Sequence, residues 1–356
     1  MNLLDQPQTF RGGGLLKMLG SIQELPNQCE QAWKEAGAIK IPASYKKCKN
    51  ALIAGMGGSG LGPHIALSTF ASALKKPVEI WNDYFTPAWV NEDTLVLLVS
   101  YSGSTEETIS AAREVGKKTK KRVLIATGGP LADVIEAEGQ PVYRFTPIFN
   151  PAGVPRMAVG YGLAATTAIL SRTGILDIGN AEMKKFINSL RSAYKLYNPA
   201  VPLAKNPAKQ LAVFLENRAG IFVTRKSLSG VVHATVNQIN ESAKHFAVMF
   251  RLPELNHHLL EGLGFPKSAP KDLGIVFVTS EVPAAPISQR IKLTREVAEK
   301  EGYATKTVIF PGKSRVESAA YALVAGEFVS LYLAALHKID PVGTKWVDYF
   351  KKKLAR

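Results

Sequence analysis

The stretch TLVLLVSYSGSTEET, residues 94–108, decides the fold. Its first six residues are apolar or β-branched without a break, as in a strand that is buried on both faces of a parallel sheet. Four hydroxyl residues around one glycine follow, and a helix then begins with Ser104 and Glu107 at the spacing of a capping box. Hydroxyls beside the N–H groups of a helix start predict a site for a compact anion such as a phosphate monoester. A well-capped helix without a ligand is the alternative.

The bulk composition is that of a soluble globular protein, with 46% hydrophobic and 21% charged residues in 356. This length indicates about two domains. The net charge of +15, from 44 Lys and Arg against 29 Asp and Glu, favours anionic partners such as phosphorylated metabolites. The basic residues form only short groups without interleaved aromatic residues, at 46–49, 117–122 and 351–353. We therefore expect neither a nucleic acid nor a membrane surface as partner.

Cysteine usage and the N-terminus indicate a cytoplasmic protein. The chain has two cysteines, Cys29 and Cys48, which is no disulfide framework. The first ten residues lack the basic-then-apolar pattern of a signal peptide. We identify residues 157–170 as the longest apolar tract, which is too short to span a bilayer and predicts a buried helix.

Strand and helix patterns alternate in two blocks. Strands are expected at residues 51–54, 78–81, 95–99, 123–126 and 142–145, and then at 220–224, 246–250, 274–279 and 305–309, with helices between them. A helical stretch over 15–36, interrupted at Pro26, precedes the first block, and the proline-rich residues 198–207 separate the two. We expect an N-terminal extension (1–45) and two α/β domains (46–197 and 208–356), each a doubly wound parallel sheet flanked by helices.

A glycine-rich segment, GMGGSG at residues 55–60, follows the first strand and formally satisfies G-x-G-x-x-G. A dinucleotide site would need an acidic residue about 20 positions later, and Asp83 comes later than that. The absence of a Lys-Ser/Thr ending excludes a P-loop. The hydroxyl-rich turn at residues 100–105, here called the serine turn, follows a neighbouring strand. We therefore expect the glycine-rich segment and the serine turn to converge on one phosphate monoester, with no dinucleotide cofactor.

Three further motifs carry candidate site residues. Arg156 in PAGVPRMAVGY opens an apolar helix, and its side chain is either snorkelling to solvent or held toward a polar cavity. Glu241 in NQINESAKH lies near a helix end, where a surface pair with Lys244 is the alternative to catalysis. His257 and His258 in LPELNHHLLEG are adjacent and point to different sides, so a metal site is not expected.

These motifs, with DPVGTKWVDYFKKKL at 340–354, occur in the order found in the bifunctional phosphoglucose/phosphomannose isomerases of the SIS (sugar isomerase) group, which residues 51–354 closely resemble. The resemblance implies two tandem SIS domains, a homodimer whose sites are shared between subunits, and no metal or cofactor. It implies the interconversion of glucose 6-phosphate or mannose 6-phosphate with fructose 6-phosphate through an enediol. A SIS sensor that binds a phosphosugar without chemistry, and a nicotinamide-dependent dehydrogenase, are the alternatives.

By motif match, the resemblance implies a base at Glu241, a catalytic arginine at Arg156, and a ring-opening histidine at His257 that the partner subunit supplies. The chemistry needs these residue types, because a carboxylate can move a proton between C2 and C1, and a fixed cation stabilises the enediol oxygens. Histidine exchanges protons near neutral pH, as ring opening requires. The family spacing from Glu241 favours His257, with His258 as the alternative.

The resemblance also implies substrate contacts at two ends of the sugar. Thr344 matches a sugar-pocket threonine that is associated in the family with admitting both C2 epimers, and Lys351 matches a ring-opening lysine. The implied phosphate ligands come from the two turns: Gly57, Gly58, Ser59, Ser100, Ser102 and Thr105.

Overall fold

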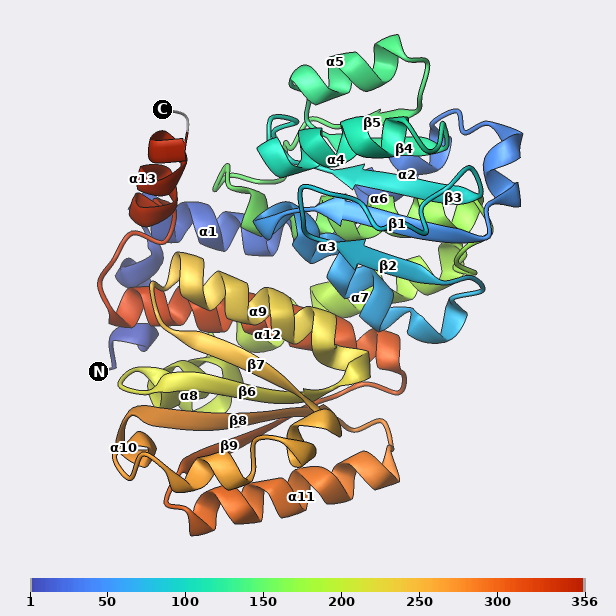
Figure 1. The fold of residues 1–356 in the computed structure, drawn as a ribbon. Helices are drawn as coiled ribbons and strands as arrows, with labels where there is room; N and C mark the ends of the chain where they lie inside the picture. The colour runs from blue at the N-terminus through green and yellow to red at the C-terminus, as the bar shows by residue number, and fades with distance from the viewer. Residues whose placement is uncertain (1, 355–356) are drawn as a thin grey trace. The chain divides into compact units, whose positions relative to one another are not determined.

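The computed structural model describes residues 2–354 (Figure 1). These residues group into two compact units. The five-stranded unit comprises residues 24–191 and 229–231, and the four-stranded unit comprises residues 2–23, 192–228 and 232–354. All nine expected strands form, and both sheets are parallel. The expected α/β class with two doubly wound sheets is confirmed, while the domain boundaries given above stay a prediction.

The sheet of the five-stranded unit has the order β2-β1-β3-β4-β5. Its strands are β1 (Asn50–Gly55), β2 (Val78–Trp81), β3 (Thr94–Val99), β4 (Arg122–Ala126) and β5 (Val142–Arg144). The chain leaves β1 toward one edge of the sheet and leaves β3 toward the other. The gap between β1 and β3 is therefore the topological switch point, where ligands of such sheets bind.

Helices cover both faces of this sheet, because right-handed crossovers that run in opposite directions place their helices on opposite faces. The helices are α2 (Leu25–Ala38), α3 (Gly57–Thr69), α4 (Glu106–Gly116), α5 (Pro130–Ala137), α6 (Val159–Arg172) and α7 (Asn180–Tyr197), the last of which continues into the other unit. On one face, α4 and α5 bury a cluster that includes Ala111, Leu131 and Ile135 against β1, β3 and β4. The helices α3 and α6 lie against each other, and α6 also lies along α2. The buried helix expected over residues 157–170 is thus confirmed as α6.

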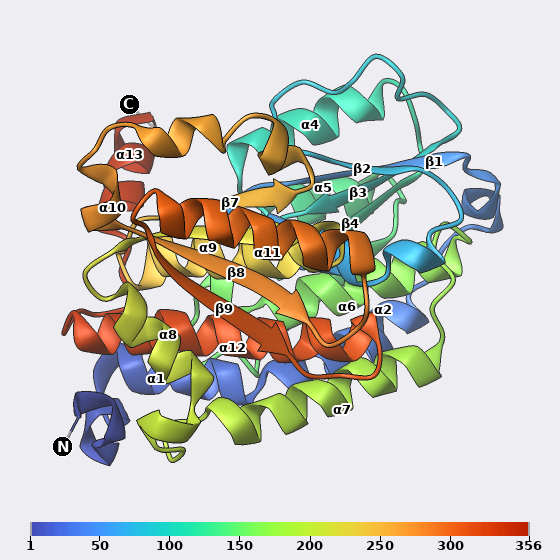
Figure 2. The ribbon, with the colours of Figure 1, turned by 90° about the horizontal axis from the view of Figure 1, so that it is seen from below.

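The four-stranded sheet has the order β7-β6-β8-β9, which repeats the order 2-1-3-4 of the first sheet. Its strands are β6 (Ala219–Arg225), β7 (Ala247–Leu252), β8 (Leu273–Ser280) and β9 (Ala304–Phe310). The helices α9 (Ser229–Ser242) and α11 (Ala285–Lys300) are its crossovers, and α11 covers one face of the sheet (Figure 2). The remaining helices are α1 (Gly13–Gln23), α8 (Pro207–Leu215), α10 (Ala269–Asp272), α12 (Arg315–Leu336) and α13 (Lys345–Leu354).

The helix α12 is long and apolar. By length and composition α12 is the one helix within residues 2–354 that could cross a membrane, with a mean hydropathy of 1.7 over 18 residues. However, 89% of that window is buried inside the protein, where α12 contacts α1 and α8. It is the core helix of the four-stranded unit, and it carries a single buried acid, Glu327.

Candidate active site

Two helix N-termini meet at the switch point of the five-stranded sheet. The last residues of β1 and β3, Gly55 and Val99, are register partners, so the two following turns start at the same level. The N-cap residues of α3 and α4 are Met56 and Thr105, and neither side chain caps its helix. The Ser59 N–H donates to the Met56 carbonyl oxygen at 3.0 Å, whereas the N–H groups of Gly57 and Gly58 and those of the first turn of α4 lie at the carboxyl edge of the sheet, where they favour an anion.

The serine turn differs from the capping box expected for it. The helix begins at Glu106 rather than after Ser104, because Ser104 bonds within the turn. Its hydroxyl lies 2.8 Å from the hydroxyl of Ser102, which also accepts a hydrogen bond from the Ser104 N–H. The turn is thus held by its own hydroxyls, and Thr105 is left as the N-cap.

The glycine-rich segment forms the first turn of α3, which begins at Gly57. A Cβ on Gly58 would lie 2.7 Å from the backbone nitrogen of Arg156, and one on Gly62 would lie 2.4 Å from that of Leu163. Gly57 adopts a left-handed φ of +46°. The glycines therefore allow α3 to approach α6 and the 3₁₀ turn Pro155–Met157 closely. As a result, the backbone of Arg156 lies against the first turn of α3.

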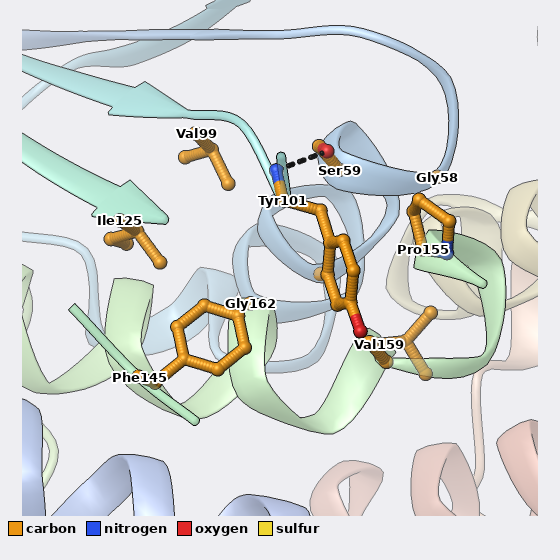
Figure 3. A pocket seen from close by; sticks show the side chains of 11 residues that line it. Gly58, Ser59, Val99, Tyr101, Ile125, Phe145, Pro155, Val159 and Gly162 are labelled. Carbon is orange, nitrogen blue, oxygen red and sulfur yellow. Dashed lines mark hydrogen bonds between the residues drawn. The ribbon is translucent and has the colours of Figure 1, made fainter. Parts of the chain in front are cut away.

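Hydroxyl groups link the two turns. The Ser59 hydroxyl accepts a hydrogen bond of 2.9 Å from the backbone N–H of Tyr101 (Figure 3). Ser100, at 0% exposure, donates to the hydroxyl of Thr105 at 3.1 Å. The implied phosphate ligands Ser59, Ser102 and Thr105 consequently lie on one connected pair of turns, and Ser100 orients Thr105.

Residues that the sequence analysis missed support this arrangement. A Cβ on Gly103 would lie 1.8 Å from the carbonyl oxygen of Gly128, and one on Gly129 would lie 2.2 Å from that of Ser102. The glycine pair 128–129 after β4 therefore packs closely against the serine turn. A Gly-Gly dipeptide marks a turn, so the sequence contained a signal for this position. Burial raises the pKa of Tyr101, whose hydroxyl accepts a hydrogen bond from Asn150 at 3.3 Å.

A small hollow of about 20 Å³ lies beneath the turns (Figure 3). Its lining is mostly apolar and consists of Gly58, Ser59, Gly62, Val99, Tyr101, Ile125, Phe145, Pro155, Ala158, Val159 and Gly162. A space of this size holds about one water molecule. It is too small for a sugar, so it is a feature of the floor of the site and not the substrate pocket.

Arg156 is buried, with 2% of its surface exposed, so the snorkelling alternative is wrong. Its turn is fixed from α2 by the fully buried amide of Gln28. The Gln28 Nε2 donates to the carbonyl oxygens of Met157 at 2.9 Å and Phe149 at 3.0 Å, and its Oε1 accepts from the Gly160 N–H at 3.2 Å. These bonds fix the backbone from which the Arg156 side chain extends.

The other candidate residues lie on the four-stranded unit. Glu241 is half-buried in the last turn of α9, where the Lys244 Nζ donates to its backbone carbonyl oxygen at 2.9 Å. His257 ends the 3₁₀ turn Glu254–His257, and both it and His258 are exposed. The His258 ring lies 6.0 Å from the ring of Phe250, centroid to centroid.

Thr344 directly precedes the C-terminal helix α13, and Lys351 lies within it. The Thr344 hydroxyl donates to the Asp348 carboxylate at 3.2 Å, and Lys351 is exposed one turn further along α13. Within residues 2–354, no group of three or more His, Cys, Asp or Glu side chains could hold a metal ion. Among the described residues, Cys29 and Cys48 are buried and are not joined in a disulfide.

The fold and site define a duplicated, doubly wound α/β protein whose first sheet presents two helix N-termini without side-chain caps at its switch point. Residues 204–354 match the bacterial phospho-glucose isomerase C-terminal SIS domain. The chain is 30% identical over 340 residues to the bifunctional phosphoglucose/phosphomannose isomerase of Caldicellulosiruptor bescii, covering 95% of this chain and 99% of that protein. The protein of the same name from Thermoplasma volcanium is 28% identical, covering 89% and 96%.

A solved structure of a hypothetical protein from Thermus thermophilus has the same fold, with a TM-score of 0.70 at 18% identity, over 96% of this chain and 91% of that one. The chain belongs to the bifunctional phosphoglucose/phosphomannose isomerase family.

Proposed function

We propose that the protein is a sugar-phosphate isomerase that interconverts glucose 6-phosphate and mannose 6-phosphate with fructose 6-phosphate. The observation that carries this proposal is the pair of uncapped helix N-termini at one switch point, joined through Ser59 and placed against the buried Arg156. Such a turn pair suits a phosphate monoester. The names of the relatives supply the sugar and the reaction.

In the proposed mechanism the phosphate ligands hold the far end of the open-chain sugar, so that binding energy at the phosphate positions C1 and C2. The Glu241 carboxylate removes the proton from C2 of the aldose, the C2–H electron pair becomes the C1–C2 double bond, and the π pair of the C1 carbonyl moves to O1, which gives the cis-enediol intermediate in its anionic form. The O2 proton then passes to O1 and the C2–O2 bond becomes the carbonyl, while the Glu241 carboxyl, whose proton exchanges with solvent, protonates C1 to give the ketose. Arg156 stabilises the negative charge that develops on the oxygens without losing a proton itself.

The remaining roles concern the ring form and the epimers. We assign ring opening to His257, which exchanges protons near neutral pH, with help from Lys351. Thr344 is assigned to the sugar pocket, where both C2 epimers must fit. We also propose a cytoplasmic homodimer in which His257 serves the partner's site, and a phosphorylated hexose as the partner molecule rather than nucleic acid or a membrane.

A non-catalytic phosphosugar sensor is not favoured, because the curated relatives over most of the chain are named as isomerases. A sensor would also need only the phosphate turns, whereas this chain places a buried arginine directly beside them.

Incubation with fructose 6-phosphate in deuterated water tests the proposal. We expect deuterium at C2 of both glucose 6-phosphate and mannose 6-phosphate, because the enediol exchanges its proton with solvent before it collapses. Glu241→Gln should bind fructose 6-phosphate nearly as well but lose turnover by a factor of ~10² or more, the scale of losing a general base. Failure to form either aldose would refute the isomerase, absence of label from the aldoses formed would refute an enediol that exchanges with solvent, and near-normal turnover of the variant would refute the assigned base.

A further inference from the structure

Lys244 lies just after the end of α9 and has an unusual backbone conformation. Its φ is +49°, in the left-handed region that favours glycine, and the N–H groups of Ala243 and His245 both donate to the Ile239 carbonyl oxygen, at 3.1 and 3.3 Å. This is the C-terminal motif in which glycine is the usual residue at the position of Lys244. A lysine there costs free energy that glycine would not.

The Lys244 ammonium connects two segments that are far apart in the sequence. Its Nζ lies 2.9 Å from the carbonyl oxygen of Glu241 and 3.4 Å from that of Ser242, at the end of α9. It also lies 3.0 Å from the carbonyl oxygen of Asp340 and 2.7 Å from that of Gly343. A cation is well placed here, because the last carbonyl groups of a helix carry partial negative charge.

The second of these segments leads directly into the C-terminal helix. Gly343 is followed by Thr344, whose carbonyl oxygen accepts from the Asp348 N–H at 2.9 Å and whose hydroxyl donates to the Asp348 carboxylate. Asp348 and Lys351 share one face of α13, because they are three positions apart. Lys244 therefore bonds both to the Glu241 backbone and to Gly343, the residue that directly precedes Thr344 at the start of the helix that carries Lys351.

We propose that Lys244 is a positioning residue that sets the base Glu241 against the segment that carries Thr344. This inference rests on the proposed function, since it assigns Lys244 to the same reaction. The role of Lys244 lies at the reacting end of the site, whereas the phosphate turns hold the other end of the sugar. Its loss consequently affects turnover and the choice between the two aldoses more than it affects substrate binding.

The test uses variants that separate charge from backbone conformation. Lys244→Met keeps the aliphatic chain and removes the charge, Lys244→Arg keeps the charge, and Lys244→Gly removes the side chain while it relieves the left-handed backbone. The matched control is Lys338→Met, because Lys338 is an exposed lysine that follows α12 with a φ of +53°. Within residues 2–354 its side chain forms no hydrogen bond or ion pair.

We expect kcat for fructose 6-phosphate to fall roughly 10- to 100-fold in both Lys244→Met and Lys244→Gly, with KM changed less than about threefold, since small misplacements of reacting groups cost this much. The ratio of mannose to glucose 6-phosphate formed initially should shift, and Lys244→Arg should recover part of kcat. The control should match the wild-type protein. Unchanged kcat and product ratio in Lys244→Gly would overturn the proposal, as would equal losses in the arginine and methionine variants.

Hydrogen exchange separates this proposal from the proposed function. Amides of residues 344–354 should exchange at least ~10-fold faster in Lys244→Met than in the wild-type protein, because the start of α13 loses its anchor, while amides of β8 keep their rates. This readout needs no activity. Failure of the wild-type protein to isomerise would refute the proposed function, whereas unchanged exchange over 344–354 would refute the anchoring by Lys244.

Discussion

Glu327 gives the four-stranded unit a specific dependence of stability on pH. Its carboxyl is 0% exposed in α12, and the Gln238 Nε2 of α9 donates to its Oε1 at 3.3 Å. Burial raises the pKa of Glu327 from 4.5 to about 8, and the hydrogen bond from Gln238 offsets only part of that rise. Between these values the folded protein keeps a proton that the unfolded chain releases. Stability therefore falls as pH rises through this window, by about 1.4 kcal/mol per pH unit.

Replacement of Glu327 by glutamine removes the titrating group and keeps its shape. The free energy of unfolding of Glu327→Gln, relative to the wild-type protein, should increase by about 3 kcal/mol between pH 5.5 and 7.5. Urea unfolding at several pH values and one protein concentration measures this difference. Glu261→Gln, at an exposed carboxylate, is the control and should show no such trend. A difference that stays constant from pH 5.5 to 7.5 would mean that Glu327 is ionised in the folded protein.

Three further substitutions test the site. Gly58→Ala should lower kcat by ~10² with unchanged circular dichroism, because the new Cβ would press on the backbone nitrogen of Arg156; full turnover would contradict this close contact. Ser59→Ala should raise KM for fructose 6-phosphate about tenfold in steady-state kinetics, because it removes the proposed donor to the phosphate and the acceptor for the Tyr101 N–H. An unchanged KM would exclude Ser59 as a phosphate ligand. His257→Ala should slow ring-closed substrates more than open-chain ones, whereas an equal loss would argue against ring opening.

The strands were predictable because each is a short apolar run in a sheet that is buried on both faces. The run from Leu95 to Val99 is fully buried, so its composition alone identifies it. The same logic placed α6. In α12, Glu327 interrupts the apolar pattern, although the helix is buried along most of its length.

The start of α3 and the burial of Arg156 could not be predicted, because both depend on contacts between residues far apart in the sequence. Gly58 can lie in a helix at this place because it has no Cβ, which would clash with the backbone nitrogen of Arg156. No pattern in the neighbouring sequence indicates this contact. Ser104 satisfied the spacing rule for a cap, yet its hydroxyl bonds to Ser102. Sequence patterns therefore located the glycine-rich segment and the serine turn that we propose as phosphate ligands. The geometry of these turns depends on tertiary packing.

The two sheets share one strand order but treat their switch points differently. Between β1 and β3, glycines and hydroxyls leave two helix N-termini open to an anion. At the corresponding gap between β6 and β8, the buried Arg225 at the end of β6 donates to the Ser280 hydroxyl and, at 3.1 Å, to the Val282 carbonyl oxygen. Burial, and then the nearby Arg315, lower the pKa of Arg225. The Arg225 guanidinium therefore bridges the second gap, whereas the first gap presents the two helix N-termini that we propose as the phosphate site.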